Sequence, residues 1–235
     1  MRWGQSASTP HIRASRADRS PHSVPPGANA LSELARRYDQ ATSSGSKRRY
    51  GAAMKQALLI IDIQQDYFPG GAYPLVEPAS AASVARQLLD RFRADGEPVV
   101  HLRHVWDAPE ATFMRPGTAG VEIHPLVAPE NQETVIEKAA PNGFFGTDLE
   151  ERLREDGVEE LVVAGMMSSM CVDATVRAAT DLGFAVTVVQ DACAAPDLEF
   201  RGRTVAGATV HDAFMAAMAD GYATVVDGDG WLAER

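Results

Sequence analysis

Residues 57–62 read ALLIID, five apolar residues followed directly by an acid. A short, continuous apolar run of this kind is typical of a strand that is buried on both faces of a parallel sheet. Similar runs follow at residues 98–102, 134–137, 161–164, 186–189 and 223–226. Helices are predicted between them, at residues 79–92, 147–156, 171–182 and 209–219. This alternation predicts an α/β fold: one three-layer α/β/α domain around a six-stranded parallel sheet, Rossmann-like in its arrangement.

The residues before Met54 differ in composition from the rest of the chain. Residues 1–53 carry nine Lys and Arg against three Asp and Glu, a balance of +6, whereas residues 54–235 have a balance of −16. Because residues 1–53 are rich in Ser, Arg, Pro, Ala and Gly, we expect a disordered N-terminal extension ahead of a single domain at residues 54–235. Two alternatives stay open: a transit peptide, or a non-native extension upstream of a functional start at Met54.

Composition indicates which classes of partner, and which cellular compartment, to expect. The net charge of −10 argues against nucleic acid and anionic membranes as partners. No apolar run approaches the roughly 20 residues of a membrane-spanning helix, and the start of the chain lacks the apolar segment of a secretory signal. The two cysteines, Cys171 and Cys193, cannot form a disulfide framework. These features predict a cytoplasmic protein.

Three reactive side chains stand at the ends of three predicted strands. Asp62 follows the first run, Lys138 follows the third, and Cys171 follows the fourth through the turn GMMSSM. The carboxyl ends of parallel strands meet at one edge of a sheet, which is where such folds bind ligands. A thiol at the start of a helix, beside an ammonium, would be favoured as thiolate, and a carboxylate could move its proton. We therefore expect Cys171 as nucleophile, Asp62 as base and Lys138 as electrostatic partner.

Each of these residues also has a simpler interpretation. An acid at a strand end is often a helix cap or a solvated terminus, most lysines are surface charges, and a lone buried cysteine usually packs as a small hydrophobe. The pattern of strand ends alone does not decide between these interpretations and catalysis.

A resemblance to a known family strengthens the catalytic interpretation. Residues 62–67, DIQQDY, resemble the D-x-Q-x-D-F opening of the isochorismatase-like cysteine hydrolases. Residues 138–149, KAAPNGFFGTDL, are similar to the family's lysine segment, and residues 165–172, GMMSSMCV, to its nucleophile turn. Asp191 and Ala192 match the end of the strand that follows. The resemblance covers about residues 57–226, and residues 113–125 look like a subgroup that includes streptothricin hydrolases.

The resemblance implies a triad of Asp62, Lys138 and Cys171, with an oxyanion hole formed by the backbone N–H groups of Met167 and Cys171. It also implies a non-proline cis peptide bond between Met167 and Ser168, and a homo-oligomer, either dimer or tetramer. Two positions depart from the family: Ser168 replaces a threonine, and Gly143 stands where many members have serine.

Several further side chains are expected to bind a small-molecule substrate. They are Gln64, Tyr67, Phe68, His104, Trp106, Phe113, Phe144 and Ser168, with Met166 and Met170 as further pocket residues and Arg115 as a contact to a substrate acid or a neighbouring subunit. For each of them ordinary core packing is the alternative.

The histidines do not predict a metal centre. His101, His104 and His124 lack metal-ligand spacing, and His104, Val105 and Trp106 stand where family members that act on nicotinamide have an Asp-x-His pair. We expect no metal and no other cofactor, His101 in the core, and Cys193 as a structural residue.

The function predicted from the sequence is hydrolysis of a C–N bond in a small amide or lactam through a thioester, with streptothricin-like lactam opening as one form. Two alternatives remain: vinyl ether hydrolysis of the isochorismatase type, which does not need the cysteine, and a catalytically idle interaction module.

Overall fold

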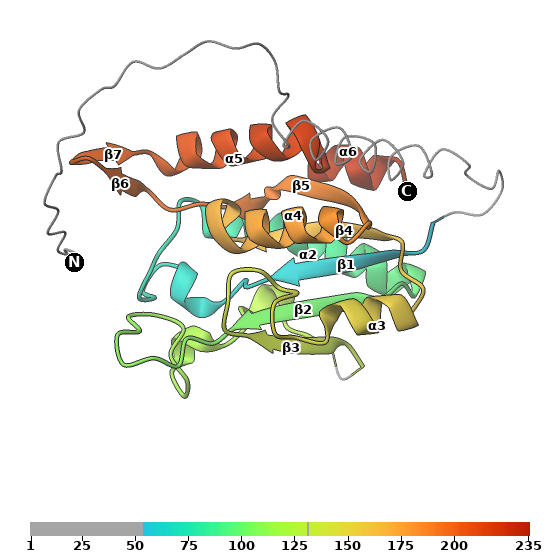
Figure 1. Cartoon of the computed structure of the whole chain (residues 1–235), viewed down its shortest axis with the longest axis horizontal. Coiled ribbons are helices and arrows are strands. Elements are labelled where there is room, and N and C mark those ends of the chain that lie inside the picture. Colours follow the sequence, from blue (N-terminus) through green and yellow to red (C-terminus); the bar gives the residue numbers. More distant parts are fainter. Residues whose placement is uncertain (1–53, 131) are drawn as a thin grey trace, which may run out of the picture. The chain divides into compact units, whose positions relative to one another are not determined.

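The computed structural model describes residues 54–130 and 132–235. The predictions for residues 1–53 lie outside this range. The central sheet has six parallel strands in the order β3-β2-β1-β4-β5-β8, which confirms the predicted α/β fold (Figure 1). Its strands are β1 (Gln56–Ile61), β2 (Val99–His104), β3 (Thr134–Lys138), β4 (Glu160–Met166), β5 (Ala185–Ala194) and β8 (Thr224–Val226).

Alternation along β1 divides the core between the two faces of the sheet. Leu58 and Ile60 join one apolar cluster, while Leu59 and Ile61 join the other. The first cluster is covered by α2 (Pro78–Asp95) and α6 (Gly228–Ala233), and the second by α3 (Leu149–Glu155), α4 (Asp173–Asp181) and α5 (Gly207–Gly221). The central strands β1 and β4 are thus buried on both sides, which is why their sequences are almost wholly apolar, while the edge strands β3 and β8 are partly exposed.

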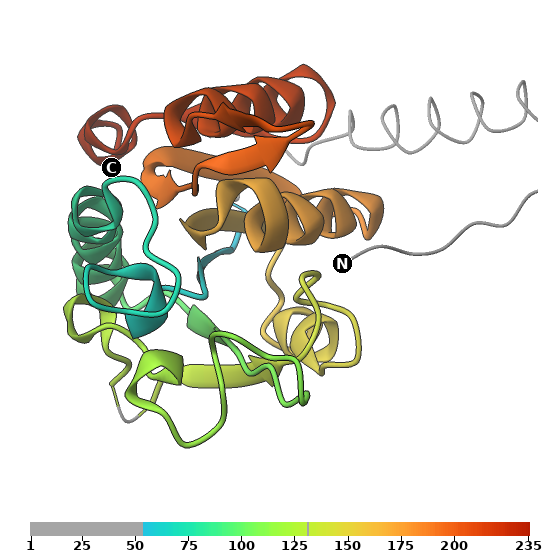
Figure 2. The ribbon, with the colours of Figure 1, turned by 90° about the vertical axis from the view of Figure 1, so that its left-hand side faces the viewer.

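The strand order changes direction at β1. The chain runs outward through β2 and β3 on one side of β1, and then returns to place β4, β5 and β8 on the other side. The carboxyl ends of β1 and β4 therefore form a switch point, where open α/β sheets bind ligands. Figure 2 looks toward this edge of the sheet.

Five elements differ from the sequence-based predictions. The helix expected from Cys171 starts later, at Asp173, after one π-helical turn at Ser168–Val172. Strand β5 continues to Ala194, past the polar residues Gln190 and Asp191 that interrupt its apolar pattern. The hairpin of β6 (Leu198–Phe200) and β7 (Arg203–Val205) and the short helix α6 were not predicted.

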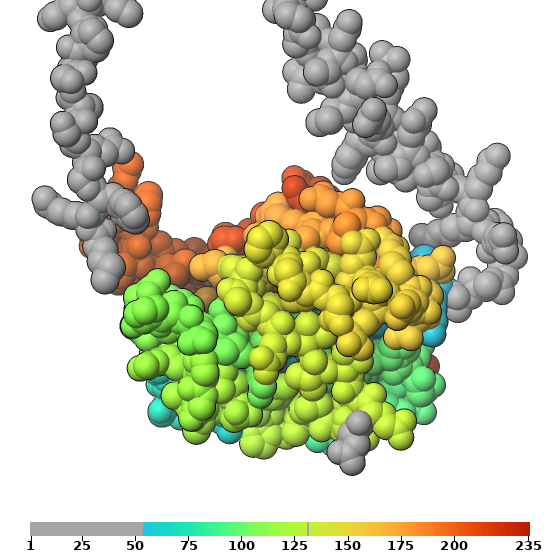
Figure 3. All heavy atoms as spheres, turned by 60° about the horizontal axis from the view of Figure 1, so that its bottom comes forward, coloured from blue at the N-terminus to red at the C-terminus, as the bar shows by residue number. Residues whose placement is uncertain are grey.

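The long connection between β2 and β3 has no regular strand or α-helix among its described residues. It holds two short 3-10 helices, Ala119–Val121 and Pro125–Val127. In Figure 3 it forms a broad green surface beside the yellow segment that carries α3. No helix among the described residues combines the length and the apolar character that a membrane crossing requires.

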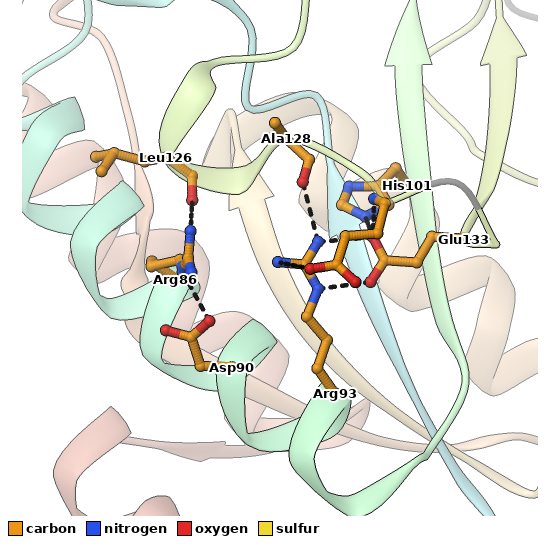
Figure 4. A network of polar contacts seen from close by, with 8 residues as sticks. Arg86, Asp90, Arg93, His101, Leu126, Ala128 and Glu133 are labelled. Atoms are coloured by element: carbon orange, nitrogen blue, oxygen red, sulfur yellow. Dashed lines mark hydrogen bonds and ion pairs between the residues drawn. The ribbon is translucent and has the colours of Figure 1, made fainter.

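A partly buried polar network ties the end of this connection to α2 (Figure 4). Arg93 donates from Nε and Nη2 to the Glu133 carboxylate at 2.7 and 2.8 Å, and from Nη2 to the Ala128 carbonyl at 2.9 Å. His101 of β2 lies 3.0 Å from Glu133 through Nε2. Its ring is 1% exposed, so it belongs to the core, as the sequence predicted.

Candidate active site

Asp62 follows the last residue of β1 and is completely buried. Its φ of +50° lies in the left-handed region, which short polar residues tolerate and which occurs often at functional sites. Its amide donates to the Leu102 carbonyl at 3.0 Å, so the backbone of β2 fixes the turn. The carboxylate therefore lies at the switch point of the sheet.

Lys138 is the last residue of β3 and is 3% exposed. Its ammonium has three partners: Asp62 Oδ2 at 2.7 Å, the Ala140 carbonyl at 3.0 Å and His104 Nδ1 at 3.2 Å. Burial alone would lower the pKa of Lys138, but the neighbouring Asp62 and Cys171 outweigh burial and raise it. The side chain is thus held as a cation that spans the end of β2 to reach Asp62.

Cys171 lies in the π-helical turn between β4 and α4 and is 4% exposed. Asp62, His104 and Cys171 each place one potential ligand atom within 4.8 Å of those of the other two. The structure therefore brings the predicted trio together from three separate strand ends.

The protonation of Cys171 differs from the sequence-based expectation of a resting thiolate. Burial raises the pKa of the thiol, the Asp62 carboxylate raises it further, and the Lys138 ammonium only partly opposes them. The resting site therefore contains a neutral thiol beside an ion pair. The sequence-based argument counted the helix start and the lysine, but not the loss of water around the sulfur, which raises the pKa of the thiol.

The turn before Cys171 carries a non-proline cis peptide bond, between Met166 and Met167. This is one residue earlier than predicted. The Met167 carbonyl accepts from the amides of Met170 and Val172 at 3.0 and 3.2 Å. The Met167 N–H has no backbone acceptor among the described residues, so it is available to a substrate oxygen as an oxyanion-hole donor would be.

Gln64 has a different task from the substrate binding that was predicted. Its side-chain amide donates to the carbonyls of His104 and Val121 at 2.9 and 2.7 Å, and accepts from the His104 amide at 2.8 Å. Because backbone partners occupy the completely buried amide, Gln64 braces the end of β2 against the long connection.

His104 is the last residue of β2 and lies in register with Lys138. Burial lowers the pKa of its ring, and the Lys138 cation lowers it further. The ring is therefore neutral, with Nδ1 accepting from Lys138 and Nε2 carrying the hydrogen. Such a ring could donate one hydrogen bond to a substrate.

Three of the predicted aromatic residues, Tyr67, Phe113 and Trp106, pack in one group with Tyr73. Phe113 lies against each of the other three, and neighbouring ring centroids in the group are 4.9 to 6.5 Å apart. Burial raises the pKa of Tyr67, as do Cys171 and Asp62, which places this buried phenol beside the trio.

The remaining aromatic residues lie apart from this group. Phe68 stacks on His124 at 3.7 Å, and Phe144 stacks on Phe184 at 6.1 Å, against the cluster on the opposite face of the sheet. The packing of Phe144 departs from the predicted pocket wall. Arg115 lines a cavity of about 630 Å³ together with Phe113 and Asp66.

The donor atoms of Asp62, His104 and Cys171 are of types that bind a divalent cation. In this geometry, however, the Lys138 ammonium already binds both Asp62 and His104, and a cation would have to compete with it. The absence of a metal stays a prediction, to be checked by metal analysis of the purified protein. Cys193 is buried and directs its thiol to the Val189 carbonyl, so it packs as a structural residue.

Sequence reasoning missed one group next to the nucleophile turn. Ser168 was expected to bind substrate, but it is completely buried and its Oγ lies 2.9 Å from Nδ1 of His211, which belongs to α5. His211 is not at a strand end, so the rule that located the trio could not find it. The available signal was a histidine in the first turns of an otherwise small and apolar helix.

Comparison with known proteins agrees with this geometry. The family described as Isochorismatase domain matches residues 56–230. The isochorismatase family protein YddQ of Bacillus subtilis is 51% identical over 179 residues, covering 76% of this chain and 99% of the relative. Streptothricin hydrolase of Streptomyces noursei is 38% identical over 174 residues, covering 74% of this chain and 60% of that protein.

A solved structure from Oleispira antarctica, described as an isochorismatase hydrolase, superimposes with a TM-score of 0.74 and 46% identity, covering 78% of this chain and 98% of that one. The fold, the extent of the family match and the relatedness agree. The chain belongs to the isochorismatase family of hydrolases.

Proposed function

We propose that the protein is a cysteine hydrolase that cleaves a C–N bond in a small amide or lactam. The observation that carries the proposal is the buried ion pair of Asp62 and Lys138 beside the Cys171 thiol. Asp62 has no hydrogen-bond donor among the described residues other than its Lys138 partner and the neighbouring thiol. A carboxylate in this position is suited to accept the thiol proton.

The mechanism follows from these positions. Asp62 accepts the proton of Cys171 as the sulfur attacks the substrate carbonyl, and the resulting oxyanion is bound by the N–H groups of Met167 and Cys171. The C–N bond then breaks, and Asp62 returns the proton to the leaving amine. This leaves a thioester on Cys171. In the second half, Asp62 accepts a proton from water as the water attacks the thioester, and the thiol is restored when the acid leaves.

Lys138 keeps the charge of the site balanced during both halves. An unpaired charge in the interior is costly, and the Lys138 ammonium lies 2.7 Å from Asp62 Oδ2. The ammonium also stabilises the thiolate that forms during attack.

We expect a small molecule as the only substrate class, because the three side chains are at most 4% exposed. The similarity to streptothricin hydrolase supports a cyclic amide as the first substrate to test. We expect neither nucleic acid nor membrane as a partner, and a homo-oligomer as the working form.

The test is a hydrolysis screen of lactams, small linear amides and nicotinamide, with Cys171→Ala and Asp62→Asn as controls. We expect turnover of at least one amide or lactam and a loss of about 10³-fold or more in each variant, as for other nucleophile and base removals. Trapping with hydroxylamine should release the acyl group from Cys171.

Vinyl ether hydrolysis would give a different result. That reaction does not need the cysteine, so a Cys171→Ala variant with full activity would contradict the proposal. A folded wild-type protein that turns over no substrate and forms no acyl adduct would instead favour an idle interaction module.

A further inference from the structure

A hydrogen-bonded chain of four polar side chains runs from the nucleophile turn to the start of α6. Ser168 Oγ lies 2.9 Å from His211 Nδ1, and His211 Nε2 lies 2.9 Å from Gln190 Oε1. Gln190 Nε2 in turn donates to Asp227 Oδ1 at 2.6 Å. The members come from the π-helical turn, α5, β5 and the N-cap of α6.

The direction of every hydrogen bond in this chain is determined by its last member. The Asp227 carboxylate can only accept, so the NH₂ group of Gln190 must face it and the Gln190 carbonyl must face His211. His211 therefore donates from Nε2, and its Nδ1 is an acceptor. The only hydrogen left for that acceptor is the hydroxyl hydrogen of Ser168.

Ser168 stands between the two residues that provide the oxyanion-hole amides in the proposed mechanism, Met167 and Cys171. Its side chain is completely buried, and its hydroxyl is fixed by His211. The peptide that joins Met167 to Ser168 carries the Met167 carbonyl, which accepts from the amides of Met170 and Val172. A change in the backbone angles at Ser168 would therefore move the turn that carries the two oxyanion-hole amides.

His211 is not held in place by tight packing alone. Its ring lines a cavity of about 240 Å³, together with Asp191, Asp212 and Cys193. With open space on one side, the two hydrogen bonds supply the orientation of the ring. Burial lowers the pKa of His211, which Asp191 and Asp212 only partly oppose, so the neutral form that the chain requires is the form present at neutral pH.

We propose that His211 is a positioning residue for the nucleophile turn: as the Nε2–H tautomer it binds the hydroxyl of Ser168 and thereby aims the oxyanion-hole amides. The inference rests on the proposed function for its catalytic consequence, while the tautomer and the hydrogen-bond direction stand independently of it.

Two variants of His211 separate positioning from packing. In His211→Asn the side-chain oxygen stands two bonds from Cβ, where Nδ1 stood, so it can still accept from Ser168. In His211→Gln the amide group stands three bonds from Cβ, where Nε2 stood, so it keeps the contact to Gln190 and loses the one to Ser168. The two variants thus keep opposite ends of the chain.

On a substrate identified by the hydrolysis screen, we expect His211→Gln and Ser168→Ala each to lower kcat by about 10-fold, with KM changed by less than about 2-fold. His211→Asn should stay within about 3-fold of wild type. The double variant His211→Gln/Ser168→Ala should lose no more than either single variant, because both remove the same contact. Equal losses in the Asn and Gln variants, or an effect on KM alone, would overturn the positioning role.

A measurement without substrate distinguishes failure of this inference from failure of the proposed function. In ¹⁵N-histidine NMR, the signals missing from His211→Asn identify His211, and we expect them to show hydrogen on Nε2 and none on Nδ1 at neutral pH. Ser168→Ala should shift the Nδ1 signal and leave the Nε2 signal in place. If His211 carries its hydrogen on Nδ1 or is doubly protonated, the inference is wrong whatever the activity of the protein.

Discussion

Cys171 has two charged neighbours that act on its pKa in opposite directions. Lys138 lowers the pKa, while Asp62 and burial raise it, and together the latter two prevail. We therefore expect the thiol to lose its proton as the sulfur attacks a substrate carbonyl. In this arrangement the sulfur can react with a bound substrate although it is not ionised in the free protein.

This balance predicts an unusual effect of removing the base. In Asp62→Asn the charge that raises the pKa of Cys171 is gone and Lys138 remains, so the thiolate becomes more populated at neutral pH. We expect iodoacetamide to label wild-type Cys171 more slowly than free cysteine, and to label Asp62→Asn faster than wild type, while hydrolysis falls.

The labelling experiment has a built-in control. Cys193 is the second of the two cysteines in the chain and is buried, so a Cys193→Ala background isolates the signal of Cys171. Circular dichroism should be used to check that the Asp62→Asn variant is folded. Slower labelling in the folded variant would show that Asp62 does not control the ionisation of the thiol.

Gly143 explains one departure from the family pattern. A Cβ there would lie 2.5 Å from Leu102 Cδ1 and 3.3 Å from Thr175 Oγ1. The hydroxyl of Thr175 already accepts from the Gly143 amide at 2.9 Å. Thr175 from α4 thus provides a hydroxyl next to this loop. Other members of the family have a serine within the loop itself.

At the scale of elements, the network of Arg93, Glu133 and His101 fastens α2 to the strand edge (Figure 4). Burial would raise the pKa of Glu133, but the hydrogen bonds from Arg93, the Glu130 amide and His101 lower it to about 2. A carboxylate with a depressed pKa stabilises the fold above its unfolded pKa, and this contribution is lost as the pH falls.

We therefore expect Glu133→Gln to destabilise the protein near pH 7 and to have less effect in acid. The difference from wild type should be about 2 to 3 kcal/mol near neutral pH, since each pKa unit corresponds to about 1.4 kcal/mol. It should shrink as the pH falls from about 4.5 toward 2, as measured by urea unfolding.

Glu130→Gln is the matched control, because Glu130 also pairs with Arg93 but at 3.6 Å and with a side chain that is 70% exposed. It should change stability by less than about 1 kcal/mol at any pH. An equal effect of the two variants would contradict the role of the partly buried network.

The sequence predicted the elements whose pattern is regular and missed those defined by tertiary contacts. The apolar runs located all six strands of the sheet. The strand β5 extends past Asp191 because that carboxylate accepts from the Gly228 amide at 2.8 Å, a partner 37 residues away. Helix α6 contains two glycines in six residues, and it is held by Trp231, which stacks on Phe92 at 5.5 Å.

The same distinction between regular pattern and tertiary contact applies to the candidate site. Asp62, Lys138 and Cys171 stand at strand ends, so topology alone brought them together. Gln64 and His211 owe their positions to partners 21 to 57 residues away, which no local pattern encodes. The charge state of Cys171 depends on burial, a property of the folded protein only.

At the scale of the whole molecule, the family match lies within residues 54–235, the range predicted to form the domain. The family match begins at residue 56, and the relative from Bacillus subtilis aligns over 99% of its length with 76% of this chain. A chain that starts at Met54 should therefore unfold with a thermal midpoint within a few degrees of the full chain and keep the same kcat.

Calorimetry and the hydrolysis assay on both chains check this prediction. The full-length chain, with its basic segment of +6, serves as the reference. A truncated chain that is unfolded or inactive would show that residues 1–53 contribute to the folded domain.

The burial of Cys171 also has a consequence for the lifetime of the protein. Peroxide oxidises thiolates far faster than thiols, and beyond the sulfenic acid the damage is generally irreversible. The Cys171 sulfur is 4% exposed, and burial and Asp62 both raise the pKa of its thiol, so we expect it to be protected from such oxidants between turnovers. We then expect oxidative inactivation to require transient opening of the nucleophile turn, so that the stability of this turn limits the rate at which the protein ages under oxidative stress.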